Sequence, residues 1–303
     1  MVVVLAGGTG GAKLAAGLYG ALAPGELTVI ANTGDDVEVY GVHVSPDPDL
    51  LTYWLAGTID ERGWGIRDDT WQVMEALEAA GRETWFRLGD RDLAMCLVRT
   101  SQLHAGARLT EAHGEVVKAL EVGARILPMS DAPVRTHVRS RGEWRAFQEF
   151  MIVDRASGPI EAVELRGADR AAPPPEVLSA LAEAEAIVIG PSNPIISIGP
   201  ILAVPGMREA IVASPAPVVA VSPFISGRAV KGPTDAFMEH AGLPRSAAGI
   251  AQAYHGLLDG LVADEPAPSA GVPVLEIDTL MNDAAGRRRV AERTLDFARN
   301  LAR

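Results

Sequence analysis

The chain has 303 residues, of which 48% are hydrophobic and 22% are charged, and its formal net charge is −12. A chain of this length and composition can bury a substantial core, which argues against intrinsic disorder. The negative charge would repel a phosphate backbone, and the one dense basic run is Arg287–Arg289, so we expect no nucleic-acid partner.

The cysteine content and the N-terminal segment bear on the compartment. Cys96 is the one cysteine, so no disulfide can form within the chain, which suits a reducing cytoplasm. The N-terminal apolar run is broken by glycines and Lys13 before it could span a bilayer or act as a signal. We therefore expect a cytoplasmic protein with no membrane segment, in which Cys96 is a buried structural thiol rather than a nucleophile.

Short apolar runs predict strands at Val2–Ala6, Leu27–Ala31, Arg125–Leu127, Ala186–Ile189, Val218–Val221 and Val274–Ile277. Most are continuous rather than alternating, which is typical of strands covered on both faces in a parallel sheet. Apolar residues at helical spacing predict helices at Ala12–Ala23, Asp69–Ala80, Glu111–Val122, Pro175–Ala184, Thr234–Ala241 and Ala284–Ala302. The alternation predicts an α/β fold with a doubly wound, mostly parallel, Rossmann-like sheet.

The stretch Thr136–Arg166 interrupts this rhythm. His137–Arg139, Phe150–Val153 and Ile160–Leu165 look like short strands with turns between them. We predict a small antiparallel insertion, or cap subdomain, near residues 136–170 of a single domain that spans residues 1–303.

A glycine turn follows the first predicted strand. Glycine amides at the start of a helix let a phosphate approach closely, although a strand-to-helix packing turn is the alternative. Leu14 follows Lys13 where a P-loop has Ser or Thr, and Lys13 replaces the third glycine of the dinucleotide fingerprint. These departures count against a P-loop enzyme and a nicotinamide-dependent oxidoreductase. We predict that the turn binds an anionic substrate through Gly8, Thr9, Gly10, Gly11 and Lys13.

Acidic turns follow the second predicted strand. In Asn32–Asp36, Asn32 and an acidic residue could hold a ribose hydroxyl or a metal. Asp47 and Asp49 then stand two apart in a proline-stiffened loop, a pair that suits a divalent cation touching phosphate oxygens, or a general base beside a metal ligand. The alternatives are solvated turn residues and caps of a helix over Leu50–Ala56.

A further polar motif places Arg91 between Asp90 and Asp92 at a predicted helix start. The planar fork of an arginine binds phosphate or the polar edge of a ring, and neighbouring carboxylates could hold the fork in place. A local ion pair and helix cap is the alternative.

Two more turns are predicted to reach the same crevice. Ser130 and Asp131 follow one strand, and Ser130 has no Gly-x-Ser-x-Gly elbow that would make it a nucleophile. Gly190–Pro200, with Ser192 and Asn193, follows another strand. Because parallel strands end at one sheet edge, the two glycine turns predict a single anion-binding crevice there.

Histidines and tryptophans give weaker signals. The six histidines show no paired zinc spacing, and His104 and His113 lie on polar, helix-like stretches where we expect surface residues. Trp64, between Gly63 and Gly65, is predicted to fill the core or, alternatively, to stack on a planar ring.

Eight segments, in order along nearly the whole chain, resemble the 2-phospho-L-lactate transferase family of coenzyme F420 biosynthesis. They are Gly7–Lys13, Asn32–Asp36, His43–Asp49, Gly63–Ile66, Leu88–Leu93, Leu127–Asp131, Gly190–Leu202 and Ser222–Pro233. The resemblance implies transfer of a phospho-acid from a guanylyl diphosphate to the deazaflavin Fo, with Mg²⁺ bound and GMP released. The acid is phospholactate in archaeal members and phosphoenolpyruvate in actinobacterial ones.

The resemblance also implies roles for residues of this chain. Asp49 and Arg91 would contact the deazaflavin alcohol, with Asp49 near the magnesium and Asp49 or Asp47 taking the hydroxyl proton. The glycine turn and Gly190–Pro200 would hold the guanylyl diphosphate. Asp90, Ser130, Asp131, Ser192 and Asn193 complete the expected substrate-binding set. The chain departs from the family at Pro48, usually leucine, and at Leu50, usually threonine, which removes a hydroxyl beside Asp49.

Family members are dimeric, so a homodimer is expected. A related family of nucleotide-sugar-binding regulatory proteins shares the Gly-Gly-Thr-Gly start and the Asn-Thr turn, but the Arg91 motif and Gly63–Gly65 favour the transferase. No motif distinguishes lactate, enolpyruvate and glycerate as the transferred acid.

Overall fold

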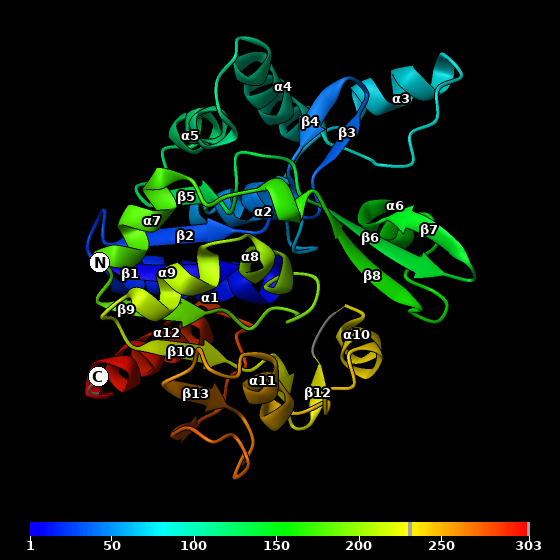
Figure 1. The fold of residues 1–303 in the computed structure, drawn as a ribbon. Helices are drawn as coiled ribbons and strands as arrows, with labels where there is room; N and C mark the ends of the chain where they lie inside the picture. The colour runs from blue at the N-terminus through cyan, green and yellow to red at the C-terminus, as the bar shows by residue number, and fades with distance from the viewer. Residues whose placement is uncertain (230–231, 302–303) are drawn as a thin grey trace.

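The computed structural model describes residues 1–229 and 232–301, arranged around one central parallel sheet (Figure 1). The strand order is β14-β13-β10-β9-β1-β2-β5, and every pairing printed for these strands is parallel. The strands are β1 (Val2–Ala6), β2 (Leu27–Ala31), β5 (Arg125–Pro128), β9 (Ala186–Ile189), β10 (Val218–Val221), β13 (Gly260–Ala263) and β14 (Val274–Glu276). The predicted Rossmann-like class is confirmed, and β13 is an additional strand.

The chain order reverses at β1. From β1 the sheet continues through β2 and β5 on one side, and through β9, β10, β13 and β14 on the other. In doubly wound sheets, ligands bind outside the carboxyl ends of the strands at such a switch point. The turns that follow β1 and β9 meet there because these two strands are hydrogen-bonded neighbours.

Helices cover both faces of the sheet, and β1 contributes to both cores. Val2, Val4 and Ala6 belong to one apolar cluster, whereas Val3 and Leu5 belong to the other. The first face is covered by α1 (Gly8–Ala21), α2 (Pro46–Leu55), α5 (Leu109–Ala119) and α12 (Ala284–Asn300). The second face is covered by α7 (Pro175–Ala182), α8 (Gly199–Ala203), α9 (Met207–Ala213) and α11 (Ala247–Ala253).

A segment between β2 and β5 extends from the sheet at the top of Figure 1. It consists of the hairpin β3 (Val37–Val39) and β4 (Val42–Val44), with α3 (Gln72–Ala79) and α4 (Asp90–His104). An apolar cluster of its own, which includes Val42, Met74 and the buried thiol of Cys96, holds it together. The predicted burial of Cys96 is confirmed.

The cap insertion is an antiparallel sheet in the order β7-β6-β8, as expected near residues 136–170. Its elements are β6 (Arg135–Ser140), β7 (Glu143–Ala146), α6 (Phe147–Ile152) and β8 (Ala162–Arg166), followed by the 3-10 turn Ala168–Arg170. The strand predicted at Phe150–Val153 is wrong, because α6 occupies this position. Phe147 and Phe150, three residues apart, lie on one helical face and pack against Phe237 of α10 (Thr234–His240).

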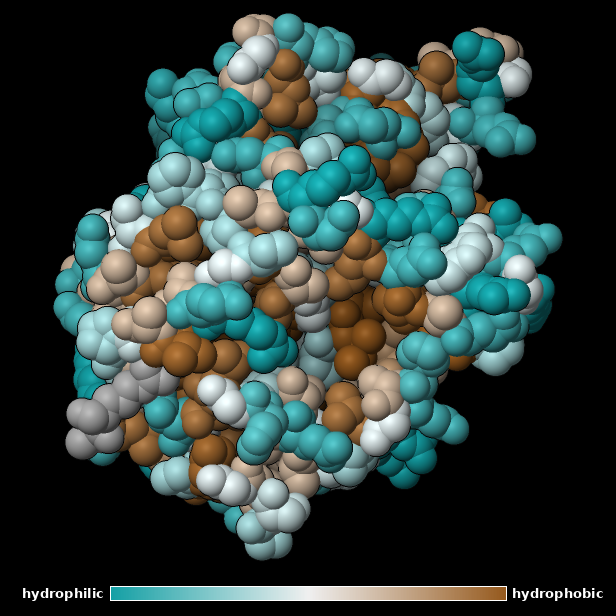
Figure 2. All heavy atoms as spheres, in the orientation of Figure 1, coloured by the Kyte–Doolittle hydropathy of each residue, from teal (hydrophilic) through white to brown (hydrophobic). Residues whose placement is uncertain are grey.

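The hairpin β11 (Phe224–Ile225) and β12 (Arg228–Ala229) completes the described elements. The predicted Ser222–Pro233 segment includes residues 230 and 231, and the predicted helix Ala284–Ala302 includes residue 302; these three lie outside the described residues. Within residues 1–229 and 232–301, no helix is both long and apolar enough to cross a membrane. Figure 2 shows apolar side chains gathered in a hollow between the cap insertion and the part of the molecule where α10 lies.

Candidate active site

The turns after β1 and β9 touch each other through their backbones. A Cβ on Gly10 would lie 2.1 Å from the carbonyl oxygen of Pro191, and a Cβ on Gly11 would lie 2.6 Å from Oγ of Ser192. Gly190 N also donates to the carbonyl of Leu5 at 2.9 Å. Glycine is required at Gly10 because the neighbouring backbone leaves no room for a side chain.

A cavity of about 450 Å³ opens at this edge of the sheet. Residues predicted to bind substrate that line it are Gly8, Thr9, Gly10, Lys13, Asp47, Ser192 and Asn193. Its other walls include Arg62 and Trp64 from the segment after α2, Phe147 and Met151 from the cap, and residues 279–282 before α12. Gly11 is buried beneath the turn, where it allows the close approach of Ser192.

Asp47 lies in the first turn of α2 and forms part of the cavity wall. Its Oδ1 accepts a hydrogen bond from Gly8 N at 2.7 Å, and its Oδ2 accepts one from Nδ2 of Asn32 at 2.9 Å. Burial raises the pKa of Asp47 to about 6, and the two hydrogen bonds oppose this rise. Asn32 is fully buried and also binds Gly34 N and the carbonyl of Ile196, so it holds Asp47 from behind the wall.

Asp35 is a cavity residue that the sequence did not single out. Its Oδ1 is buried and has no hydrogen-bond partner among the residues that the structure describes. Burial, followed by the negative charge of Asp47, raises the pKa of Asp35 well above its ordinary value. Its position in the acidic turn Asn32–Asp36 was a signal, but the sequence did not show which acid would face the cavity.

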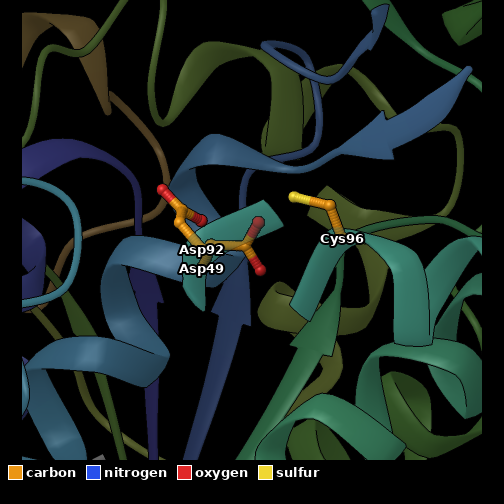
Figure 3. Close-up of side chains that lie close together, drawn as sticks. All are labelled: Asp49, Asp92 and Cys96. Carbon is orange, nitrogen blue, oxygen red and sulfur yellow. The ribbon is translucent and has the colours of Figure 1, made fainter. Parts of the chain in front are cut away.

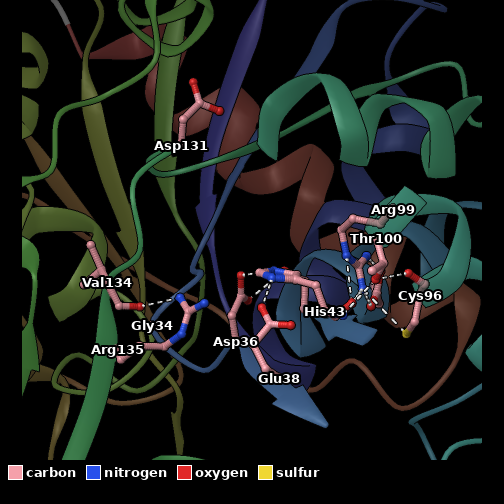
Figure 4. A network of polar contacts seen from close by, with 12 residues as sticks. Gly34, Asp36, Glu38, His43, Cys96, Arg99, Thr100, Asp131, Val134 and Arg135 are labelled. Atoms are coloured by element: carbon pink, nitrogen blue, oxygen red, sulfur yellow. Dashed lines mark hydrogen bonds and ion pairs between the residues drawn. The ribbon is translucent and has the colours of Figure 1, made fainter. Parts of the chain in front are cut away.

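Asp49 lies deeper and does not line the cavity. Nη1 of Arg99 donates to its Oδ1 at 2.6 Å and Nη2 to its Oδ2 at 2.8 Å, while Arg99 also donates to the carbonyl of His43 (Figure 4). The Arg99 side chain is 0% exposed and that of Asp49 5%. Burial would lower the pKa of Arg99, but the charge of Asp49 and the hydrogen bonds between the two side chains raise it overall.

The predicted pairing of Asp47 with Asp49 fails for a geometric reason. α2 begins at Pro46, so both aspartates are helical, and side chains two apart on a helix do not face each other. Asp47 therefore reaches Gly8 while Asp49 reaches Arg99 of α4.

Asp49, Asp92 and Cys96 form a cluster whose potential ligand atoms lie within 4.8 Å of one another (Figure 3). Asp92 accepts a hydrogen bond from the Tyr53 hydroxyl at 2.7 Å, and burial followed by the charge of Asp49 raises its pKa to about 7. Burial raises the pKa of the Cys96 thiol, which keeps it protonated. The Arg99 guanidinium already binds both oxygens of Asp49. This cluster therefore does not fit Mg²⁺, and the contacts of Asp49 do not suit the metal role predicted for it.

Arg91 and Asp90 begin α4 and do not line the cavity. Asp90 accepts hydrogen bonds from Oγ1 of Thr70 and from two backbone amides at the start of α3, and these bonds lower its pKa. The Arg91 side chain is exposed, and its Nη1 lies 3.4 Å from the carbonyl oxygen of Arg67. The Arg91 contact with substrate therefore stays a prediction.

Ser130 and Asp131 also lie outside the cavity wall. Oγ of Ser130 accepts from Ala132 N, and Asp131 accepts from the amide and hydroxyl of Thr110 and pairs with Arg108 at 3.0 Å. Figure 4 shows Asp131 at a distance from the His43 cluster. Both side chains therefore stabilise the loops and the helix start around them.

His43 anchors the acidic turn. Its Nε2 is 2.9 Å from Oδ2 of Asp36, its Nδ1 is 2.6 Å from Oε1 of Glu38, and Oγ of Ser45 donates to the other oxygen of Asp36 (Figure 4). Burial lowers the pKa of His43, but Asp36 and then Glu38 outweigh it, so that the pKa is raised. These contacts fix Asp36 and, next to it, the cavity residue Asp35.

The structure decides the expectations for two histidines and for Trp64. His104 is exposed, as predicted, whereas His113 is fully buried, contrary to prediction, because it lies on the face of α5 that packs on α2. Burial lowers the pKa of His113 to about 4. Trp64 is 50% exposed and lines the cavity, so the core alternative is wrong for this residue.

Fold and site define a Rossmann-like α/β protein with a carboxylate-bearing cavity beside a glycine turn suited to phosphate groups. The family model described as 2-phospho-L-lactate transferase CofD matches residues 2–284. The chain therefore belongs to this transferase family.

Relatives of similar length support this assignment. Proteins named phosphoenolpyruvate transferase are 44% identical in Kitasatospora aureofaciens, over 98% of this chain and 97% of the relative, and 42% identical in Streptomyces griseus, over 98% of each. The protein of the same name from Mycolicibacterium smegmatis is 39% identical over 98% of each chain. A crystal structure of a UPF0052-family protein from Bacillus halodurans superposes with a TM-score of 0.61 at 21% identity, covering 97% of this chain and 98% of that one, which supports the fold.

Proposed function

We propose that the protein transfers a phosphoenolpyruvyl or phospholactyl group from a guanylyl diphosphate to the deazaflavin Fo in coenzyme F420 biosynthesis. The terminal ribityl hydroxyl of Fo forms a bond to the phosphorus that carries the acid. The bond from that phosphorus to the bridging oxygen breaks, and GMP leaves with this oxygen. Such reactions depend mainly on positioning and charge neutralisation.

One observation carries the proposal: in a member of this family, a glycine turn, the Ser192–Asn193 turn and two carboxylates with raised pKa line a single cavity. The glycine turn and Ser192–Asn193 supply amides and polar groups for a diphosphate. Lys13, which also lines the cavity, supplies positive charge there. The bound donor would thus lie beside Asp35 and Asp47.

The residues of the cavity wall fit a magnesium ion. Mg²⁺ is usually held by one or two carboxylates together with substrate phosphates, and the buried, unpartnered Oδ1 of Asp35 offers an oxygen of that kind. Asp35 would hold the ion, with Asp47 beside it. Mg²⁺ in such a site neutralises the charge that develops on the departing phosphate.

Asp47 is the proposed proton acceptor. Gly8 and Asn32 fix its carboxylate in place, and a pKa of about 6 suits a base that works near neutral pH. The hydroxyl proton of Fo would move to an oxygen of Asp47 as the new phosphorus–oxygen bond forms. This assignment replaces Asp49, which is paired with Arg99 and does not line the cavity.

The names of the relatives favour the phosphoenolpyruvyl group as the one transferred. A cytoplasmic location and a homodimer remain proposals that rest on the family resemblance. The family model and the names of the relatives favour the transferase over the alternative function, a nucleotide-sugar-binding regulatory protein.

The test is to incubate the purified protein with Fo, Mg²⁺ and, separately, the phosphoenolpyruvyl, phospholactyl and phosphoglyceryl guanylyl diphosphates. Mass spectrometry would follow new deazaflavin products and GMP. We expect product with the phosphoenolpyruvyl donor, loss of product with Asp47→Asn, and retained product with the matched variant Asp296→Asn, an exposed aspartate of α12 that does not line the cavity. No product with any donor, together with nucleotide-sugar binding, would favour the regulatory function.

A further inference from the structure

A large aromatic side chain stands half exposed in the cavity wall. Trp64 is 50% exposed, although an indole is usually packed away from water. It lies in a tight turn in which Asp60 N donates to the carbonyl of Gly65 at 3.1 Å and Gly63 N donates to that of Asp60 at 2.9 Å. Ile59 and Ile66 form an antiparallel bridge at its base, so the turn is a small, internally bonded hairpin.

Cationic side chains hold the indole in place. The Arg62 guanidinium lies 4.3 Å from the ring centroid of Trp64 and 5.6 Å from that of Trp71, and Arg87 lies 5.4 Å from the Trp71 ring. Nε of Arg62 donates a 2.6 Å hydrogen bond to Oδ1 of Asp60, which fixes the guanidinium. Arg62 covers one face of the Trp64 indole, and both side chains line the cavity.

The hairpin is attached to the helix that carries Asp47. α2 ends at Leu55, and the amides of Thr58 and Ile59, where the hairpin begins, donate back to the carbonyl of Tyr53. Asp47 and Trp64 thus lie at opposite ends of one continuous segment, and both line the same cavity. A molecule with a hydroxyl at Asp47 and a planar ring several bonds away could occupy both ends.

We propose that Trp64, backed by Arg62, is the stacking platform for the fused ring of the deazaflavin acceptor and so contributes to acceptor specificity. The inference rests on the proposed function. Fo has a planar ring at one end of its ribityl chain and the attacking hydroxyl at the other, which matches the placement of Trp64 and Asp47 along one cavity. The glycine turn, which would bind the diphosphate, contacts Asp47 through Gly8 N, so the donor would approach the Asp47 end of the cavity.

The test compares Fo binding by the wild-type protein and three variants, followed through the fluorescence of the deazaflavin. Trp64→Ala is expected to weaken Fo binding by roughly 10- to 100-fold, the range for loss of an aromatic stacking partner. Trp64→Phe, which keeps a ring, should recover much of the affinity. Trp144→Ala is the matched control, because Trp144 also stacks with an arginine, at 5.4 Å from Arg166, but lies outside the cavity.

Steady-state kinetics separate the acceptor from the donor. We expect Trp64→Ala to raise the KM for Fo while the KM for the guanylyl donor stays unchanged. A raised donor KM with unchanged Fo affinity would assign the indole to the guanine base and overturn the inference, as would wild-type Fo affinity in Trp64→Ala. Absence of Fo binding by the wild-type protein would instead refute the proposed function, and the inference with it.

Discussion

The buried ion pair between Asp49 and Arg99 gives the most discriminating prediction. Asp49→Asn removes the negative charge that faces a guanidinium with 0% exposure. Breaking such a pair by removing one partner costs about 3–5 kcal/mol, because an uncompensated charge remains buried. Asn retains one acceptor oxygen, and Arg99 keeps its bonds to the His43 carbonyl, so we expect the lower end, about 3 kcal/mol.

That loss is a large fraction of the roughly 5–15 kcal/mol by which a native domain is stable. With about 2.1 cal/mol/K of unfolding entropy per residue over 303 residues, it corresponds to a fall in Tm of roughly 5 °C. Urea unfolding, followed by tryptophan fluorescence and far-ultraviolet circular dichroism, would measure it. The matched control is Asp278→Asn, which removes an exposed pair with Arg289 and should leave the unfolding midpoint unchanged.

A double replacement tests the cause of the loss. Asp49→Leu with Arg99→Met removes both charges, and an apolar pair in their place should recover much of the stability. Folded Asp49→Asn should also keep most of its kcat. A variant with wild-type stability but no turnover would refute the reasoning, and would return Asp49 to the chemistry at the acceptor.

Three further predictions concern the cavity. Gly10→Ala should destabilise the protein by about 1–3 kcal/mol and weaken donor binding, because the added Cβ would meet the Pro191 carbonyl. The control is Gly20→Ala in the same helix, where a Cβ would have no atom within 4 Å; thermal unfolding should show it to be neutral or slightly stabilising. Asp47→Asn should abolish transfer, and its stability relative to the wild type should gain up to about 3 kcal/mol between pH 3.8 and pH 7, because a pKa raised from 3.8 to about 6 makes the ionised carboxylate of the wild type a cost to the folded state. Unfolding midpoints measured against pH should show this gain disappearing as the pH falls from 6 to 3.8, and a constant gain would contradict the cause. EDTA should abolish product formation, and added Mg²⁺ should restore it. Asp35→Asn should raise the Mg²⁺ concentration required for activity. Full activity in EDTA would show that the reaction does not need the ion.

Much of the central fold could be predicted from the sequence. β1, β2, β9 and β10 have the predicted bounds, because strands buried on both faces leave continuous apolar runs. β13 escaped prediction, since Gly260–Ala263 is short and begins with glycine. α1 begins at Gly8 rather than Ala12, since the glycines form its first turn as well as the anion-binding loop.

The contacts of the site were less predictable, because they join distant residues. Nothing local shows that Asp49 pairs with Arg99, 50 residues away. A weak signal exists in α4, where Leu93, Cys96 and Thr100 lie on the buried face and Arg99 falls within the same stripe. An arginine at such a position needs a buried counter-charge, but the sequence cannot say which carboxylate supplies it.

The distribution of charge separates the structural carboxylates from those of the cavity. Asp49 is neutralised by Arg99, and Asp36 is paired with His43, so these two acids stabilise the segment around α4 and the turn after β2. Asp35 and Asp47 are buried in the cavity wall, and the folded protein disfavours their ionised forms. Both pKa values are raised as a result, and a bound divalent cation would stabilise the ionised forms of the two carboxylates. The pair that fits a metal and a base is thus formed between a turn and a helix, not by two neighbours in the sequence.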